Sequence, residues 1–246
     1  MVVAQERALN EAAAYSIRID VAEVDTSVVT ETLAVGTVQS LILRVAGDFE
    51  RAEQCYRQCL AVDPADLRAR SNLLMLLNYR PDVEADAVFA EHLEYGRILA
   101  NIVPAMAVQQ TVRDPGKRLK VGYISADFRE HSVAAYIEPI LKYHDHDRFE
   151  ICCYSYLPAP DSTTLRLKSL ADVWQDIDGL SDGAVTQRIR GDAVDILIDL
   201  AGHTGNNRLA IFAAKPAPVQ ITYLGYPNTT GLSTIDYRIT DAIADP

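Results

Sequence analysis

From Lys117 onward, strand-like and helix-like patterns alternate along the chain. Short apolar runs rich in β-branched and aromatic residues are separated by segments with the spacing of amphipathic helices. The predicted strands are 118–128, 149–157, 172–177, 195–200, 219–224 and 237–240, and the predicted helices are 133–143, 162–171, 183–190 and 208–214. Strands that alternate with helices form βαβ units, whose parallel sheet is covered on both faces. The sequence therefore predicts an α/β, Rossmann-like lobe over residues 117–246.

Residues 36–104 have helical patterns instead. The stretch 47–64 places small or apolar residues on one helix face, and Pro64 ends it. The offsets of the second helix of a tetratricopeptide repeat are matched by Gly47, Phe49, Ala52, Tyr56 and Pro64. Further helical patterns cover 67–78 and 85–100. Because about three such repeats are normally needed for stability, we interpret this all-α segment as a remnant or terminal cap of a longer array.

Two segments lie outside these parts. Residues 1–35 remain unassigned, with one helical pattern at 6–19, and residues 105–116 have the composition of a connector. The expected organisation is thus an unassigned and partly helical 1–35, a tetratricopeptide-like 36–104, a connector 105–116 and a Rossmann-like lobe 117–246.

Composition excludes several classes of function. The 246 residues carry a formal net charge of −11, and both halves are acidic, which disfavours a nucleic-acid partner held by phosphate contacts. No signal peptide or membrane-spanning run is apparent, so we expect a cytoplasmic protein without a membrane partner. The four cysteines match neither a disulfide framework nor a zinc site, and no metal is expected.

Two polar loops follow directly on apolar strands. The first, 202–208, follows the predicted strand 195–200, and the second, 224–231, follows the strand 219–224. In open α/β sheets, ligands bind in the crevice outside the carboxyl ends of the strands. The turn after the first strand lacks the Gly-x-Gly-x-x-Gly of dinucleotide-binding domains, and no P-loop motif is present. These loops mark a candidate site that differs from the usual nucleotide fingerprints.

Two histidines occur in these turns. His131 opens a helix after the first strand, where an imidazole can hydrogen-bond a sugar hydroxyl or an acceptor group; the alternative is a local helix cap. His203 lies in the loop 202–208, where it either meets a polar ligand or belongs to a turn that caps the next helix. The residues alone leave both pairs of alternatives open.

Several blocks together resemble a known family. They are LKVGYISADFREH at 119–131, FEICCY at 149–154, DILIDLAGHT at 195–204, PAPVQ at 216–220, LGYPNTTG at 224–231 and DYRITD at 236–241. In this order they are similar to the catalytic region of the protein O-linked N-acetylglucosamine transferases, of the bacterial type in glycosyltransferase family 41. The resemblance covers about half of the chain, and the repeat-like helix precedes it.

The resemblance implies an inverting, metal-independent glycosyltransferase of the two-lobed GT-B architecture. Such enzymes transfer N-acetylglucosamine from UDP-N-acetylglucosamine to Ser or Thr hydroxyls of a protein or peptide acceptor, without a cofactor. By position, His131 matches the catalytic-loop histidine near the donor sugar and acceptor. The positions that match donor- or acceptor-binding loops are Thr204, Arg208, Leu224, Gly225 and Pro227, and His203 lies in the same loop as Thr204.

Two departures shape the functional expectation. Gln187 and Arg190 stand where animal members have an Asp and a His, so no base role is transferred to them. The chain also ends where the family continues into a second lobe that supplies a lysine and most UDP-binding groups. We therefore expect a truncated or split form, inactive alone, whose second lobe is carried by a separate chain.

Two other functions remain open from the sequence. One is a non-catalytic interaction module built from repeat helices and an orphan lobe. The other is an N-linked glucosyltransferase variant of the same broad family.

Overall fold

The computed structural model describes residues 43–44, 47–107 and 116–243. The chain divides into two compact units, 1–80 and 81–246, and each is treated separately below. The predicted helix at 6–19 lies outside the described residues.

In the first unit, α3 (Phe49–Val62) packs against α4 (Leu67–Leu77) as a helix pair. Both helices begin at an aspartate whose carboxylate accepts backbone N–H groups: Asp48 from Arg51, and Asp66 from Arg68 and Ala69. The buried residues of α3 are Ala52, Tyr56 and Cys59, and those of α4 include Leu73, Leu74, Leu76 and Leu77. The helix pattern predicted for 47–64 therefore buries the face that its spacing indicated.

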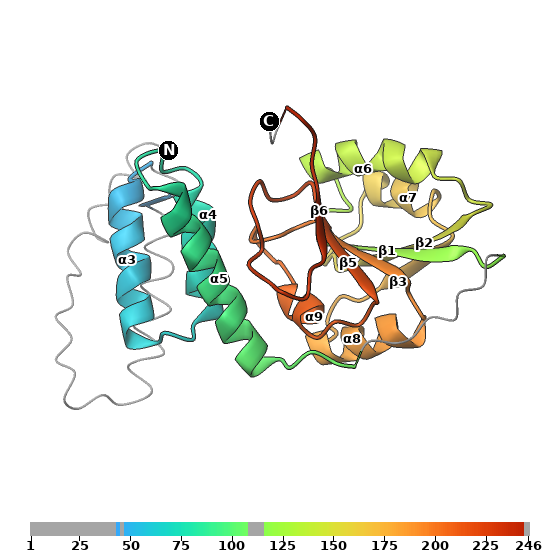
Figure 1. Ribbon diagram of the computed structural model, residues 1–246. Helices are drawn as coiled ribbons and strands as arrows, with labels where there is room; N and C mark the ends of the chain where they lie inside the picture. The colour runs from blue at the N-terminus through green and yellow to red at the C-terminus, as the bar shows by residue number, and fades with distance from the viewer. Residues whose placement is uncertain (1–42, 45–46, 108–115, 244–246) are drawn as a thin grey trace. The chain divides into compact units, whose positions relative to one another are not determined.

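The second unit contains a six-stranded sheet, shown from yellow-green to red in Figure 1. Its strands are β1 (Leu119–Ser125), β2 (Phe149–Ser155), β3 (Val173–Asp176), β4 (Ile196–Asp199), β5 (Val219–Tyr223) and β6 (Tyr237–Ile239). The order across the sheet is β3-β2-β1-β4-β5-β6, and every neighbouring pair is parallel. The predicted Rossmann-like sheet is confirmed.

Helices cover both faces of this sheet (Figure 1). One face carries α6 (Ser132–Tyr143) and α7 (Ser162–Lys168), and the other carries α8 (Asp182–Gly191) and α9 (Leu209–Ala213). The core under α6 contains Val121, Ile137, Leu141, Ile151 and Ile198, each at most 6% exposed. Because helices cover both faces, β1 and β2 each have five consecutive buried residues, which explains why these strands are apolar along most of their length.

The helix α5 (Ala85–Ile102) belongs to the second unit, although its pattern was grouped with the repeat-like segment 36–104. It packs on α9, and its buried residues include Val88, His92, Tyr95 and Leu99. The compact unit that holds the sheet thus begins near residue 81 rather than at 117. Periodicity revealed that α5 buries one face, but not what that face packs against.

Glycine permits a very close approach at Gly96, in the middle of α5. A Cβ at this position would lie 1.9 Å from the carbonyl oxygen of Gly231, which has φ +75°. Conversely, a Cβ on Gly231 would lie 1.9 Å from the His92 carbonyl oxygen. The α5 backbone therefore touches the loop after β5 with no room for a side chain on either side.

This contact predicts an inverted effect of alanine in a helix. Gly→Ala inside a helix normally stabilises a protein by about 0.5–1 kcal/mol. Gly96→Ala should instead lower the free energy of unfolding by about 1–3 kcal/mol, because the added methyl overpacks against backbone. Urea unfolding measures the change.

The matched control is Gly183→Ala in α8, where an added Cβ meets nothing within 4 Å. This variant should be neutral or slightly stabilising. A Gly96→Ala protein as stable as the control would show that α5 does not hold this close contact.

Candidate active site

Three loops leave the carboxyl edge of the sheet around its switch point. The chain order reverses between β1 and β4, which lie side by side in the sheet. His131 follows β1, the segment 200–208 follows β4, and the segment 224–236 follows β5. Because crevices at such switch points bind ligands in open α/β sheets, this edge is the candidate site.

The loop after β4 is fixed by the buried carboxylate of Asp199. Its Oδ1 accepts the N–H of Ala201 at 3.0 Å, and its Oδ2 accepts the N–H of Gly202 at 2.8 Å. Oδ2 also accepts the hydroxyl of Thr222, on β5, at 2.9 Å. Burial raises the pKa of Asp199, while these three hydrogen bonds act in the opposite direction. One side chain thus ties the start of the β4 loop to the neighbouring strand.

The loop after β5 begins with a strained turn. Leu224 has φ +76°, a left-handed conformation that is unfavourable for a leucine. At Gly225 a Cβ would lie 2.0 Å from the carbonyl oxygen of Leu200, so only glycine fits where the two loops pass each other. Pro227 is exposed two residues further on. The three positions predicted for binding therefore form one shaped turn beside the β4 loop.

His131 is the N-cap of α6, and its exposed side chain lies at the carboxyl end of β1. Its Nδ1 accepts the backbone N–H of Val133 at 3.2 Å, while Asp127 Oδ2 lies 3.8 Å from the same nitrogen. When Nδ1 accepts, the neutral ring carries its proton on Nε2. The local cap considered as the alternative for His131 is present, and it leaves Nε2–H as a donor for a ligand.

His203 is 1% exposed, so the structure buries the ring that we expected to face a ligand. Its Nε2 donates to the carbonyl of Thr230 at 3.0 Å. The ring meets three others edge-on: Tyr95 with centroids 4.5 Å apart, Tyr226 at 5.2 Å and His92 at 5.4 Å. Aromatic side chains from α5 and from the β5 loop therefore enclose the His203 ring.

The side chain of Arg208, a predicted binding residue, makes several contacts with protein acceptors. Its Nε donates to the carboxylate of Asp182 at 2.6 Å, and its other two nitrogens donate to the carbonyls of Ile177 and Leu180. The guanidinium carbon lies 5.4 Å from the centroid of the Tyr156 ring. Arg208 therefore holds the β3–α8 segment against the β4 loop.

Thr204 stabilises its own turn, since its hydroxyl donates to the carbonyl of Ala201 at 2.8 Å. In α8, Gln187 is exposed, and Arg190 donates to the carbonyl of Ala107 at 3.0 Å. Both residues lie in the second half of α8, which leads to the start of β4 at the amino edge of the sheet.

Four residues of this site region were not found from the sequence: Asp199, His92, Tyr95 and Tyr226. An acidic residue at the end of an apolar strand was the available signal for Asp199. For His92, Tyr95 and Tyr226 the contacts are long-range, and His92 and Tyr226 are separated by 134 positions.

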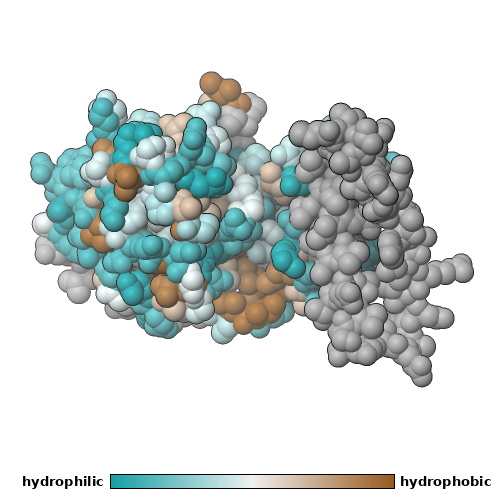
Figure 2. Space-filling model, turned by 180° about the vertical axis from the view of Figure 1, so that it is seen from behind, coloured by the Kyte–Doolittle hydropathy of each residue, from teal (hydrophilic) through white to brown (hydrophobic). Residues whose placement is uncertain are grey.

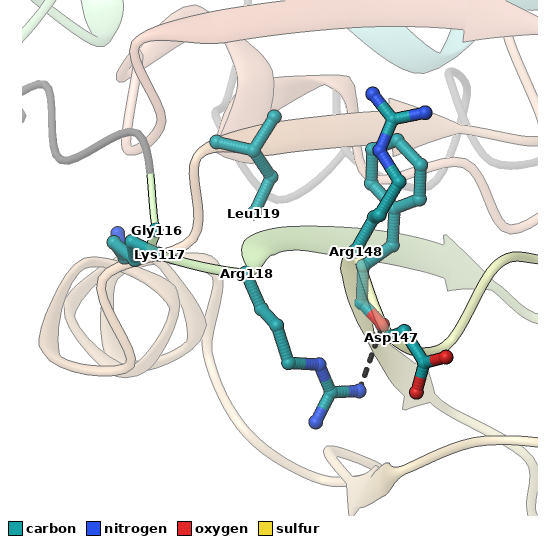
Figure 3. A pocket seen from close by; sticks show the side chains of 7 residues that line it. Gly116, Lys117, Arg118, Leu119, Asp147 and Arg148 are labelled. Carbon is teal, nitrogen blue, oxygen red and sulfur yellow. Dashed lines mark hydrogen bonds between the residues drawn. The ribbon is translucent and has the colours of Figure 1, made fainter.

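A pocket of about 330 Å³ lies at the opposite, amino edge of the sheet (Figure 3). It is lined by Gly116, Lys117, Arg118, Leu119, Asp147, Arg148 and Phe149. Two of its basic side chains bind protein acceptors. Lys117 forms an ion pair with Asp195 at 3.0 Å, and Arg118 donates to the carbonyl of Phe149 at 2.8 Å. We place the site at the carboxyl edge because the strained turn and the exposed imidazole are there.

Two further features concern the described residues only. They contain no group of three or more His, Cys, Asp or Glu side chains able to hold a metal ion. Within the same ranges no helix has the length and apolar character needed to cross a membrane.

On the face seen in Figure 2, outside the grey atoms, hydrophilic residues predominate and hydrophobic ones form small groups.

Comparison with known proteins places the chain in a class. The model of Glycosyl transferase family 41 matches residues 87–246, which include most of α5 and the whole sheet. The chain therefore belongs to this glycosyltransferase family. The match begins inside α5, in agreement with the packing of that helix on the sheet unit.

Individual relatives agree with the family. The rice (Oryza sativa subsp. japonica) protein named "Probable UDP-N-acetylglucosamine--peptide N-acetylglucosaminyltransferase SPINDLY" is 41% identical over 197 residues, covering 78% of this chain and 21% of the relative. The Caenorhabditis elegans UDP-N-acetylglucosamine--peptide N-acetylglucosaminyltransferase is 39% identical over 135 residues, covering 53% and 12%. The chain spans about a fifth or less of the length of these curated relatives.

A solved structure has the same fold. A mutant of the Thermobaculum terrenum O-GlcNAc transferase superposes with a TM-score of 0.81 at 35% sequence identity. The match covers 85% of this chain and 40% of the solved chain.

The burial of His203 predicts a defined pH dependence of stability. Desolvation, together with the nearby His92, lowers the pKa of His203 from 6.5 to about 3. As pH falls below about 6.5, the unfolded state takes up a proton that the folded state does not, so folding stability declines by up to about 1.4 kcal/mol per pH unit. The stability contributed by the neutral, buried His203 ring is fully present above pH 6.5 and is lost as the pH falls toward 3.

His203→Gln isolates this contribution, because an amide can still donate to Thr230 but does not titrate. Urea unfolding of both proteins between pH 7 and about 4.5 should show their stability difference shrinking on acidification. An unchanged difference across that range would show that His203 is not held neutral by burial.

Proposed function

We propose that the sheet unit forms the acceptor-side and sugar-side half of a protein O-N-acetylglucosaminyltransferase site. In this reaction a Ser or Thr hydroxyl attacks the anomeric carbon of UDP-N-acetylglucosamine, the bond to the diphosphate breaks with inversion, and UDP and the hydroxyl proton are released. The observation that carries the proposal is the strained turn 224–227, which lies at the switch-point edge together with the exposed His131. Family membership and the names of the relatives support the same chemistry.

His131 is the catalytic residue of this proposal. With Nδ1 occupied by the N–H of Val133, the neutral ring offers Nε2–H to an oxygen of the donor sugar or the acceptor. The imidazole then acts chiefly as an oriented donor, which contributes to rate by positioning and by stabilising developing charge. This geometry differs from that of a general base, which would need a free lone pair toward the acceptor.

The turn 224–227 is the backbone part of the proposed sugar site. Leu224 has a left-handed conformation, and Gly225 lets the turn pass against the carbonyl of Leu200 while its own N–H donates to the carbonyl of Tyr223. The sugar of this proposal packs against the exposed side of the turn, at Pro227. The proposed reaction uses neither a metal nor an organic cofactor, and the diphosphate is stabilised by groups of a second lobe.

The other three predicted residues of these loops have structural roles in the proposal. Thr204, Arg208 and His203 hold the shapes of the β4 and β5 loops through protein acceptors, as their hydrogen bonds indicate. We assign them to the architecture of the site rather than to direct contact with a ligand.

A chimera tests the function of His131. The matching segment of the Thermobaculum terrenum enzyme, in its wild-type form, would be replaced by residues 81–246 of this chain. We expect this chimera to transfer labelled N-acetylglucosamine from UDP-N-acetylglucosamine to an acceptor peptide. His131→Asn should lower kcat/KM by about 10²-fold or more, because the Nε2 donor is lost.

Asparagine is chosen because it is an effective N-cap, so α6 remains capped and the thermal midpoint should change little. His131→Ala, which removes both the cap and the donor, should additionally cost about 1 kcal/mol of stability. Near-normal transfer by the His131→Asn chimera would assign the histidine to capping alone.

A further inference from the structure

The helix α5 contacts both loops of the candidate site. His92, which is 0% exposed, lies 2.8 Å from the Tyr226 hydroxyl through its Nε2. Tyr95, one turn further along, packs edge-on against His203 of the β4 loop. Gly96 touches the backbone of Gly231. One helix face thus meets the β4 loop at His203 and the β5 loop at Tyr226 and Gly231.

The hydrogen bonds of His92 have a defined direction. Its Nδ1 lies 2.7 Å from the carbonyl oxygen of Val88, which can only accept, so Nδ1 carries the proton. Burial lowers the pKa of His92, which favours the neutral ring. Nε2 is then an acceptor, and the Tyr226 hydroxyl donates to it. The ring links a backbone carbonyl of α5 to a side chain in the middle of the β5 loop.

Tyr226 lies between Gly225 and Pro227, within the turn 224–227 that the proposed function uses. Its side chain is 5% exposed, and a Cβ on Gly202 would lie 2.3 Å from the Tyr226 Cβ. The tyrosine is therefore packed against the β4 loop on one side and bonded to α5 on the other. Its backbone has little freedom while both contacts hold.

We propose that His92 and Tyr226 are positioning residues, and that their hydrogen bond holds the turn 224–227 in the shape that receives the sugar and the acceptor. The catalytic part of this inference rests on the proposed function. The structural part does not, because it concerns only the mobility of the loop. Under this proposal, α5 belongs functionally to the transferase lobe rather than to the repeat-like helices.

Hydrogen–deuterium exchange of the 246-residue chain tests the structural part. Tyr226→Phe keeps the ring and removes only the hydroxyl. Amides of residues 224–232 should exchange about five- to tenfold faster, the effect of losing one buried hydrogen bond. In the chimera, the same variant should lower kcat/KM for sugar transfer by a similar factor.

Tyr154→Phe is the matched control. This tyrosine is 0% exposed, and its hydroxyl donates to Asp192 at 2.8 Å, at a site distant from the β5 loop in sequence and on another strand. It should lower the thermal midpoint to a similar extent while changing exchange at 224–232 less than twofold. Equal acceleration in both variants would mean general loosening, and would overturn the inference.

Two substitutions of His92 provide a second test that is independent of Tyr226. His92→Gln offers an amide oxygen near the position of Nε2 and should keep loop exchange within about twofold of wild type. His92→Leu removes the acceptor and should reproduce the Tyr226→Phe acceleration of about five- to tenfold. Unchanged loop exchange in both Tyr226→Phe and His92→Leu would overturn the inference.

The measurements of loop exchange and of sugar transfer distinguish a failure of the positioning role from a failure of the proposed function. A chimera without transfer activity, combined with faster loop exchange in Tyr226→Phe, would contradict the proposed function and support the link from α5 to the loop. An active chimera in which Tyr226→Phe transfers sugar normally, despite faster loop exchange, would overturn the positioning role.

Discussion

The buried carboxylate of Asp199 is the interaction from which the shape of the site follows. Its two oxygens bind the N–H groups of Ala201 and Gly202 and the hydroxyl of Thr222 on the neighbouring strand. A buried carboxyl group without partners would be costly, so these three donors also account for its presence. They hold Gly202 where it packs on Tyr226, and Tyr226 is held in turn by His92. Contacts therefore run continuously from the end of β4 to α5.

The sequence predicted the sheet because its signals are local. Every strand of the second unit coincides with a predicted apolar run, and the helices between them follow from their 3.6-residue spacing. The position of His131 after β1 was likewise predictable, since it depends only on where that strand ends. The contact of His131 with a donor or acceptor remains a prediction.

The loops were less predictable because their side chains are satisfied by distant residues. Glycines and polar residues at 202–208 suggested an open ligand loop, but His203 is buried against Tyr95 and Tyr226, and Arg208 is bound to Asp182. In the same way, the pattern of α5 resembles a continuation of the helical segment. Only its contacts with Gly231 and Tyr226 show that it belongs with the sheet.

The position of a bound ligand distinguishes the two edges of the sheet most directly. A crystal structure of the chimera with UDP-N-acetylglucosamine and an acceptor peptide should place the sugar and the acceptor hydroxyl between His131 Nε2 and the turn 224–227. A ligand bound instead in the pocket beside Arg118 and Arg148, at the amino edge, would contradict the assignment of the site.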